Sequence, residues 1–436
     1  MRRRLYCLAV QAETSVTKEA PSSNDVKFFW GSGCSPKEQL GVVMLIERVI
    51  GTVQIAVDPS FGNRIYFSKD SGISSPSKEI SFTALSDLLY QRDKTFRPYV
   101  VLWELLGACN FNCPFCYIHT GLNMPNSLWR WESIKQDVDE LISTGMLACT
   151  LSGGEPLLHP DFPILYRYLK EHGVLVRVFS NLSLLTPQLE NLFTELPPFK
   201  LEVSLYGSDD KSYCIASGQT LHTFSKLSDS ILRLRKKGVN VICKTELNAT
   251  TISSWRKIEA WCAENSVPYF FSCDLQERYD GSSVCQYVLP DEQQYMVFKE
   301  THQSIIPTVS SPKRKELFSC GAGKTGCMID YKYTVRPCLS LYKTTQLCVQ
   351  AKPGNLKDAI IEMSHRVDGL RGRKIEACRG CKASCVCEVC AKDALDFTAE
   401  ANQNLLRKCA KTICYFERLV NESSSMHKQV NSAPDL

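Results

Sequence analysis

Short apolar segments alternate with amphipathic ones six times between residues 98 and 275. The short segments are apolar enough for strands buried on both faces, and the longer ones repeat apolar residues every three or four positions, as helices do. The pattern predicts strands at 99–106, 146–153, 174–180, 200–207, 239–247 and 268–274, and helices at 131–145, 161–173, 187–195, 222–238 and 252–265. Right-handed crossovers would curl these units into an α/β fold with a parallel sheet, a partial TIM-like (β/α)6 barrel.

Regions of a different character flank this segment. The N-terminal region has strand-like runs at 43–58 and 63–68 and a helix-like run at 81–91, so we expect an α+β extension. After about residue 308 the alternation stops, cysteines crowd together and apolar periodicity is weak, and the last residues form a polar tail that we expect to be disordered. The expected domains are 1–97, 98–307 and 308–419, followed by the tail at 420–436.

Cysteine is the unusual component of the composition, with 22 among 436 residues. Disulfide scaffolds are usually short secreted chains, and the apolar run from Leu5 to Val10 is shorter than the core of a signal peptide. A cytoplasmic chain so rich in cysteine more often binds metal. The net charge of +5 gives no reason to expect nucleic acid as a partner, and no run of about 18 apolar residues indicates a membrane span.

Three cysteines lie together in the loop after the first predicted strand. The stretch CNFNCPFCY, residues 109–117, spaces Cys109, Cys113 and Cys116 as C-x3-C-x2-C. Loops at this end of a barrel form its active site. Three thiolates on a four-iron cluster leave one iron open to an exogenous ligand, and an open position is what a catalytic metal centre needs. A zinc site completed by a distant cysteine is the alternative.

With Phe115 before the third cysteine, the stretch resembles the C-x3-C-x-aromatic-C signature of the radical S-adenosylmethionine (SAM) superfamily. The resemblance implies a 4Fe–4S cluster on Cys109, Cys113 and Cys116, with the methionine amino and carboxylate groups of SAM on the open iron. It also implies an oxidoreductase that cleaves SAM reductively to a 5′-deoxyadenosyl radical, which abstracts hydrogen from the substrate. A flavodoxin- or ferredoxin-like protein would supply the electron.

Residues at the ends of further predicted strands agree with this family. The stretch SGGEP, residues 152–156, resembles its GGE element, which binds the SAM amino group. Gly153 and Gly154 would let the backbone approach closely, and Glu155 would accept hydrogen bonds from an ammonium-like group. Asn181 and Ser204 stand where the family contacts the SAM carboxylate and ribose.

The C-terminal cysteines resemble the SPASM domain of radical SAM enzymes that modify peptides and proteins, which implies two auxiliary clusters. By this resemblance, the ligands of the first auxiliary cluster are Cys320, Cys338 and Cys390, with Cys327 as a candidate fourth. Those of the second are Cys378, Cys381, Cys387 and Cys409.

The match to SPASM has departures. Tyr333 stands where the pattern has glycine, the gap before Cys390 is one residue short, and Cys385 and Cys414 compete with two of the assigned ligands. Zinc is the rival, although zinc ribbons separate their cysteine pairs by about 15–20 residues, far more than separate Cys381 from Cys387. The cysteines of the barrel region are expected to be buried as small apolar residues; these are Cys149, Cys243, Cys262 and Cys273.

The segment after the last predicted strand suggests the substrate. CDLQERYDGSS, residues 273–283, resembles the P-R-x-D-G-S linker of SPASM peptide maturases, with Glu277 in place of proline. The resemblance implies modification of a peptide by thioether or carbon–carbon crosslinking, epimerisation, oxidation or decarboxylation, as in the biosynthesis of ribosomally made peptides. Residues 1–97 would then dock a leader peptide or cap the barrel. By barrel position, Tyr117, Tyr206 and Glu246 are candidates for moving a proton.

Two other functions stay open at this point. One is maturation of a folded protein, as in anaerobic sulfatase maturation, or of a tetrapyrrole cofactor. The other is not enzymatic: a structural zinc protein or an iron–sulfur protein that relays electrons. Cys109, Cys113, Cys116 and Glu155 favour catalysis over the second.

Overall fold

The structure, a computed structural model, describes residues 98–302 and 316–430 apart from gaps at 120, 123–127, 220–222, 274, 319, 343, 376–377, 379–380, 388–389 and 396–398. Only the backbone is described at 301–302, 384–385, 391, 394, 399–404 and 423–430. In the first 97 residues, the described parts are the backbones of five strands.

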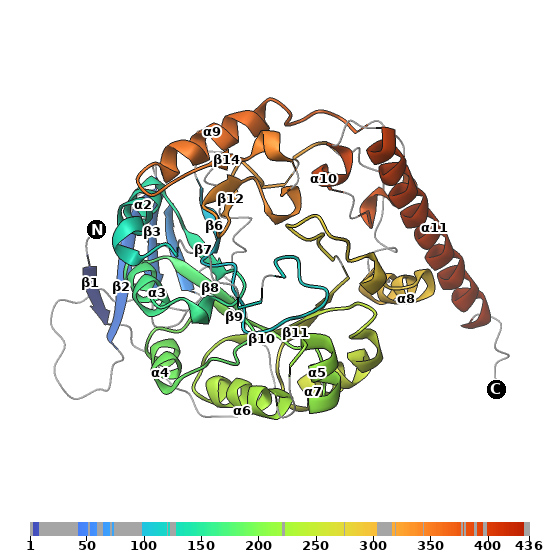
Figure 1. Ribbon diagram of the computed structural model, residues 1–436, viewed down its shortest axis with the longest axis horizontal. Coiled ribbons are helices and arrows are strands. Elements are labelled where there is room, and N and C mark those ends of the chain that lie inside the picture. The colour runs from blue at the N-terminus through green and yellow to red at the C-terminus, as the bar shows by residue number, and fades with distance from the viewer. Residues whose placement is uncertain are drawn as a thin grey trace.

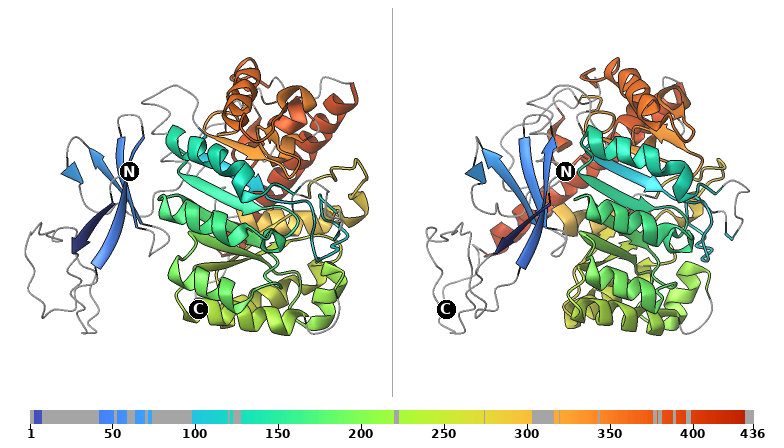
Figure 2. Two further views of the ribbon diagram at one scale, coloured as in Figure 1. Left: turned by 60° about the vertical axis from the view of Figure 1, so that its left-hand side comes forward. Right: turned by 90° about the vertical axis from the view of Figure 1, so that its left-hand side faces the viewer.

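These five strands form an antiparallel sheet in chain order, drawn in blue in Figure 2 beside the rest of the molecule. They are β1 (Arg3–Cys7), β2 (Val42–Ile50), β3 (Val53–Asp58), β4 (Arg64–Lys69) and β5 (Gly72–Ile73). The expected strand run 43–58 is therefore divided between β2 and β3, and the run 63–68 becomes β4. The expected helix at 81–91 lies outside the described residues.

The barrel consists of six parallel strands that pair in chain order. They are β6 (Val100–Glu104), β7 (Ala148–Ser152), β8 (Leu175–Ser180), β9 (Lys200–Ser204), β10 (Val241–Glu246) and β11 (Tyr269–Ser272). Each falls within a predicted strand segment. The predicted α/β class with a parallel sheet is confirmed, because apolar strands between amphipathic helices have no other way to bury both faces.

Helices cover the outer side of these strands, as Figure 1 shows. The predicted ones are α2 (Trp131–Thr144), α3 (Phe162–Glu171), α4 (Pro187–Glu195), α6 (Thr223–Lys236) and α7 (Trp255–Glu264). Short 3-10 turns accompany them at η1 (Pro156–Leu158), η2 (Ile252–Ser254) and η3 (Cys285–Tyr287). The prediction missed α5 (Asp210–Ser217), whose start is fixed by a capping box between Asp209 and Ser212.

The C-terminal region continues the barrel sheet. Strand β12 (Gly326–Ile329) pairs in parallel with the outer edge of β6, and β13 (Thr334–Arg336) and β14 (Val349–Gln350) follow in antiparallel fashion. Helix α9 (Leu356–Asp368) buries Leu356, Ile360 and Val367 in the same apolar core as the barrel. The expected weak apolar periodicity is therefore wrong for α9, which repeats apolar residues at helical spacing.

The remaining elements surround the late cysteines. They are α8 (Asp291–His302), η5 (Leu339–Leu341), η6 (Thr345–Leu347), η8 (Lys382–Cys385), α10 (Ala391–Ala394) and α11 (Ala399–Val430). Helix α11 packs against α8, where Lys299 pairs with Glu422 at 2.6 Å. The expectation of disorder from residue 420 is therefore wrong as far as 430. Within the described part of the chain, no helix combines the length and apolarity needed to cross a membrane.

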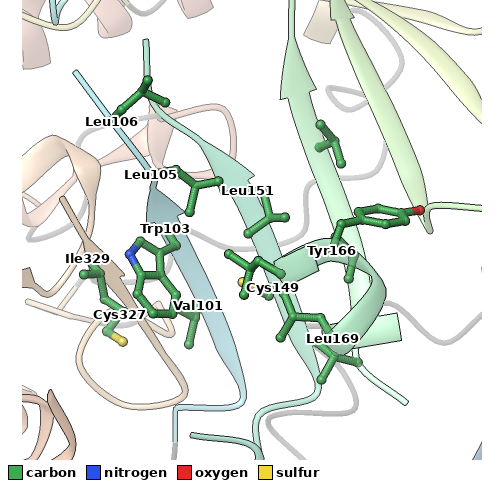
Figure 3. Close-up of a cluster of buried hydrophobic side chains, with 14 of the residues drawn as sticks. Val101, Trp103, Leu105, Leu106, Cys149, Leu151, Tyr166, Leu169, Cys327 and Ile329 are labelled. Atoms are coloured by element: carbon green, nitrogen blue, oxygen red, sulfur yellow. The ribbon is translucent and has the colours of Figure 1, made fainter. Parts of the chain in front are cut away.

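Within the core, buried side chains of β6, β7, β12 and α3 pack against one another (Figure 3). Trp103 of β6 is buried against Tyr333, with ring centroids 6.1 Å apart. Tyr333 is the residue that replaces the glycine of the SPASM pattern, and its φ of 64° is in the left-handed region that glycine adopts without strain. A buried tyrosine is kept at this strained position by its packing and by its phenol.

That phenol reaches a carboxylate that joins three elements. Asp137 of α2 is fully buried and accepts hydrogen bonds from the Tyr333 hydroxyl at 2.7 Å and from the backbone N–H groups of Gly354 at 3.0 Å and Leu356 at 3.1 Å. The last two donors lie at the start of α9, where backbone N–H groups have no acceptor inside the helix. Asp137 thus caps α9 from another helix and attaches the C-terminal region to the barrel.

We expect Asp137→Asn to lower the free energy of unfolding by about 2 kcal/mol, because an amide nitrogen would replace one of two acceptor oxygens and leave a buried donor unpaired. Urea unfolding would measure the change. Asp139→Asn is the matched control on the same helix, since the Asp139 side chain is 41% exposed and its ion pair with Lys135 is of the surface type, for which we expect less than about 1 kcal/mol. Equal losses in the two variants would contradict the role of Asp137.

Candidate active site

The loop after β6 carries the three clustered cysteines and folds over the carboxyl ends of the barrel strands (Figure 1). The backbone N–H of Cys109 donates to the carbonyl of Gly121 at 2.7 Å, which closes the loop, and the N–H of Cys116 donates to the carbonyl of Cys113 at 3.1 Å, which makes a tight turn. These bonds fold the loop that carries the three thiols, which are spread over eight residues.

The three thiols influence one another's ionisation. Burial raises the pKa of Cys113 well above its usual value, and the neighbouring thiols of Cys116 and Cys109 raise it further. Burial also raises the pKa of Cys109 to about 12. Backbone N–H groups already point at sulfur, from Phe111 to Cys109 at 3.3 Å and from His119 to Cys116 at 3.5 Å. The thiols are thus placed to be ligands once a metal displaces their protons.

The three thiols are the type of ligand that an iron–sulfur cluster uses. Among the described residues, no three His, Cys, Asp or Glu side chains are grouped so as to hold one metal ion. In an iron–sulfur cluster each thiolate binds a different iron, so its ligands need not converge on one point. The donor set, three thiols with backbone N–H groups directed at sulfur, is the chemistry that such a cluster requires.

A buried carboxylate from the next strand lies beside the thiols. Glu155 follows β7 and adds to the high pKa of Cys109 through its charge. Its Oε1 accepts from the Ser180 hydroxyl at 2.7 Å and from the N–H of Leu157 at 3.1 Å, and its Oε2 accepts from the N–H of Asn181 at 2.7 Å. Burial raises the pKa of Glu155 to about 7. A cation bound next to Glu155 would favour its ionised form, which burial disfavours.

The two glycines before Glu155 serve the cysteine loop. A Cβ atom at Gly154 would lie 2.1 Å from the carbonyl oxygen of Ala108, and one at Gly153, whose φ is 135°, would lie 2.4 Å from that of Leu106. Because neither glycine has a Cβ atom, the N–H of Gly154 can donate to the carbonyl of Leu106 at 2.8 Å, and the N–H of Glu155 to the carbonyl of Ala108 at 2.9 Å. The close approach expected from the sequence is therefore to the neighbouring loop.

The structure also brings the other expected cofactor residues to this end of the barrel. Asn181, at the end of β8, donates from its side chain to Asn110 at 3.0 Å and to the sulfur of Cys109 at 3.8 Å. Ser204 ends β9, and its carbonyl accepts from the Tyr213 hydroxyl at 3.0 Å. Phe115 is buried with its ring edge-on to Tyr206, at a centroid distance of 5.1 Å. Their contacts with SAM stay predictions.

Sequence reasoning missed Glu104, the last residue of β6. It is fully buried, and its Oε1 accepts from the hydroxyls of Tyr117 at 2.8 Å and Tyr279 at 3.0 Å, while its Oε2 has no hydrogen bond within the described residues. Burial, with the charge of Asp330, raises the pKa of Glu104 to about 8 despite the two phenols. The sequence feature that could have identified Glu104 is that it is the one acidic residue in the apolar run 99–106.

The proton-moving candidates differ in their surroundings. Tyr117 belongs to the Glu104 group, and its ring meets that of Tyr279 at 5.3 Å. Tyr206 is partly buried, and this desolvation raises its pKa well above the usual value. Glu246 forms an ion pair with Lys244 at 2.9 Å. Of the three, Tyr117 is the one whose hydroxyl is tied to a buried carboxyl group.

The C-terminal thiols fall into two groups. Burial raises the pKa of Cys338 to about 11, and the thiols of Cys390 and Cys320 add to it. Burial likewise raises the pKa of Cys409 to about 11, and its neighbouring thiols are Cys387, Cys378 and Cys381. These are the sets expected from the sequence, with one exception, Cys327. The ligand roles of both sets stay predictions.

Cys327 lies elsewhere. It is buried in the barrel core on β12, near Val101 and Trp103 of β6 (Figure 3), and its neighbouring thiol is Cys149 of β7. The expectation that Cys327 completes the first auxiliary set is therefore wrong, because pairing of β12 with β6 directs it into apolar packing. Cys414 is exposed on α11, and the side chain of Cys385 lies outside the described residues.

The exposure of the remaining barrel cysteines depends on where they lie in the sheet. Cys149, Cys243 and Cys262 are buried, as expected of small apolar residues, whereas Cys273 is exposed, which corrects the prediction for it. Cys273 follows the end of β11, the outermost strand of the sheet, so no neighbouring strand covers it.

Fold and site together define an α/β-barrel protein with a three-thiol loop at the carboxyl ends of its strands. Residues 103–257 match the family model described as the radical SAM superfamily, so this part of the chain is a radical SAM domain.

Curated relatives match mainly over the barrel. The AdoMet-dependent heme synthase of Methanosarcina barkeri is 32% identical over 119 residues, which cover 27% of this chain and 34% of the relative. The antilisterial bacteriocin subtilosin biosynthesis protein AlbA of Bacillus subtilis is 24% identical over 251 residues, 55% of either chain. The chain thus spans between a third and just over half of the length of these relatives.

Solved structures extend the likeness of the fold beyond the barrel. SuiB of Streptococcus suis, bound to the precursor peptide SuiA, superposes with a TM-score of 0.55 at 14% identity, covering 76% of this chain and 82% of SuiB. Coverage of three quarters of the chain includes more than the 155 residues, 103 to 257, of the family model. At this level of identity the likeness concerns the fold alone.

We expect Gly154→Ala to lower the iron content by about four per chain, because the added Cβ would displace the cysteine loop at Ala108. Iron and acid-labile sulfide after anaerobic purification measure this. Gly369→Ala is the control, since the nearest atom to its Cβ is the Arg366 carbonyl oxygen at 3.8 Å. Full iron in the Gly154→Ala variant would show that the loop does not depend on this contact.

Glu104→Gln should change the pH dependence of stability. In the wild type the carboxyl ionises near pH 4.5 when unfolded and near pH 8 when folded, so unfolding releases a proton between these values and stability falls as pH rises through this window. Each unit of pKa difference corresponds to about 1.4 kcal/mol. Glutamine keeps an acceptor for the two phenols but does not ionise. Urea unfolding at pH 5, 6.5 and 8 should therefore show the wild type losing stability relative to Glu104→Gln; parallel curves would contradict the assignment.

Proposed function

We propose that the chain is a radical SAM enzyme that modifies a peptide substrate. The observation that carries this proposal is the grouping of Cys109, Cys113 and Cys116 on one loop, with the buried carboxylate of Glu155 beside Cys109. In this superfamily, three thiolates and one acceptor are the protein's share of a site that SAM completes. The non-enzymatic alternatives do not explain why a carboxylate is buried next to the thiols at a cost in solvation.

The residues of this site have separable roles. Cys109, Cys113 and Cys116 would hold a 4Fe–4S cluster, which supplies the electron that cleaves SAM to a 5′-deoxyadenosyl radical. Glu155 would accept the SAM ammonium group, since its Oε2 accepts a single hydrogen bond from the described residues. The charge of that ammonium group would favour the ionised form of Glu155, which burial alone disfavours. Asn181 and Ser204 would contact the carboxylate and ribose.

The two C-terminal thiol groups would hold auxiliary clusters. Cys378, Cys381, Cys387 and Cys409 supply four thiols, enough to saturate a cluster, whereas Cys320, Cys338 and Cys390 supply three from the described residues. A flavodoxin- or ferredoxin-like protein would deliver electrons. We place the enzyme in the cytoplasm, where thiols stay reduced.

A peptide is the substrate class that the comparisons support best. SuiB, whose fold matches over three quarters of this chain, is bound to a precursor peptide, and AlbA acts in the biosynthesis of a bacteriocin. The second candidate is a tetrapyrrole, which the heme synthase relative favours, but that match covers 27% of this chain. The five-stranded sheet β1–β5 has an edge strand at each end, and we propose that it docks a leader segment by adding a strand.

The cluster assignment predicts iron content. Three four-iron clusters give about twelve irons per chain, and removing Cys109, Cys113 and Cys116 together should leave about eight. Cys338→Ala with Cys390→Ala should also remove about four, because both belong to the first auxiliary group. Cys327→Ala is the matched control and should remove none. About four irons with bound zinc would instead mean that the C-terminal groups are structural, and would withdraw the main support for auxiliary clusters.

Substrate class is tested by product analysis. The reduced wild-type enzyme should form 5′-deoxyadenosine from SAM, and Glu155→Gln should weaken SAM binding while retaining its iron. Co-expression with a short peptide encoded beside the gene, followed by mass spectrometry, should show a modified peptide. A modified iron porphyrin together with an unmodified peptide would favour the tetrapyrrole candidate.

A further inference from the structure

Residues 275–283, the linker between β11 and η3, lie against the cysteine loop. The N–H of Tyr279 donates to the carbonyl of Tyr117 at 2.9 Å, and the guanidinium of Arg278 donates through Nη2 to the carbonyl of Pro114. Arg278 is held from both sides, since its own carbonyl accepts from the N–H of Gly281 at 3.0 Å and from the Tyr342 hydroxyl at 2.8 Å. The side chain therefore has a fixed place beside the loop.

No carboxylate of the described residues contacts the Arg278 guanidinium. Within the described residues it forms no ion pair; Nη1 donates to the Ser282 hydroxyl at 3.2 Å, and the buried Nε has no hydrogen-bond partner. Two acidic residues lie close to it in sequence: Glu277, whose Oε2 is 3.5 Å from the Tyr342 hydroxyl, and Asp280, which is exposed and accepts from the Ser282 hydroxyl at 2.6 Å. Hydrogen bonds from Ser282 lower the pKa of Asp280, and the charge of Arg278 lowers it further from a distance. Glu104, the buried carboxyl group of this region, has a pKa near 8 and is neutral at pH 7.

The guanidinium of Arg278 lies on the cysteine loop close in sequence to a proposed cluster ligand, because the carbonyl of Pro114, to which it donates, is two residues before Cys116. Burial raises the pKa of Cys116, and the charge of Arg278 partly offsets that increase. A cluster held by three thiolates carries net negative charge and gains another on reduction, so a fixed cation in a region of low dielectric favours the reduced state. The same cation would have a weak effect in water, where it would be screened.

We propose that Arg278 is a positioning residue that raises the reduction potential of the cluster on Cys109, Cys113 and Cys116 by holding against the cysteine loop a positive charge that forms no ion pair with the described residues. The inference rests on the proposed function for the presence of that cluster. It assigns a role to the linker that connects the barrel to the cysteine-rich region: the linker brings a charge from outside the loop to the site where the electron must arrive.

The test is a redox titration of the full-length enzyme followed by electron paramagnetic resonance. The signal that changes when SAM is added identifies the SAM-binding cluster among the others. We expect Arg278→Gln to shift the ratio of reduced to oxidised cluster about tenfold toward the oxidised form at a fixed potential, which is about 59 mV for one electron. Arg278→Lys, which keeps the charge, should retain most of the wild-type potential.

Arg235→Gln is the matched control. Arg235 also donates to carbonyl oxygens, those of Val241 at 3.2 Å and Ser266 at 2.7 Å, but it lies at the end of α6, before β10 begins, at the opposite end of the barrel. It should leave the potential unchanged.

The outcomes separate the two proposals. A wild-type enzyme without any SAM-responsive signal would overturn the proposed function, and with it the premise of this test. A SAM-responsive cluster whose potential is the same in Arg278→Gln and wild type would overturn the role of Arg278 alone. If Arg278→Gln assembles too little cluster to titrate, Arg278→Lys decides: a near-wild-type potential supports the role of charge, and a tenfold shift refutes it.

Discussion

The contact between two backbone segments, the loop after β6 and the loop after β7, is the constraint on which the site depends. The N–H groups of Gly154 and Glu155 donate to the carbonyls of Leu106 and Ala108, and this is possible because neither Gly153 nor Gly154 has a side chain. One set of hydrogen bonds therefore fixes both the start of the cysteine loop and the carboxylate beside it. The backbone contact therefore fixes the position of Glu155 relative to the loop that carries the thiols.

Burial dominates the electrostatics of this region. It raises the pKa of the cysteine thiols, of Glu155 and of Glu104, so these groups are harder to ionise than in water. By the proposed function, iron would offset the charge of the thiolates, and the SAM ammonium group would offset that of Glu155. Arg278 differs, because its charge is permanent and comes with the chain.

The barrel and the main site could be predicted from the sequence because their signals are local. Strand and helix periods are read within a few residues, and Cys109, Cys113 and Cys116 are neighbours in the chain. The corrections at the site depend on contacts between distant segments. The spacing of Cys327 in the sequence does not distinguish it from the other C-terminal cysteines. Only the pairing of β12 with β6 directs it into the core. Glu104 and Arg278 are 174 positions apart, and no local pattern indicates that both reach the same loop.

The pairing of β12 with β6 has a further consequence for synthesis of the chain. Strand β6 is the first strand of the barrel, yet it lies inside the nine-stranded sheet, with β7 on one edge and β12 on the other. Its second edge stays uncovered until residues 326–329 have left the ribosome, more than 220 residues later. A nascent or truncated chain that ends with the barrel would display an unpaired apolar strand, which is a template for aggregation. The cysteine-rich region thus protects the barrel as it folds, independently of any metal it binds.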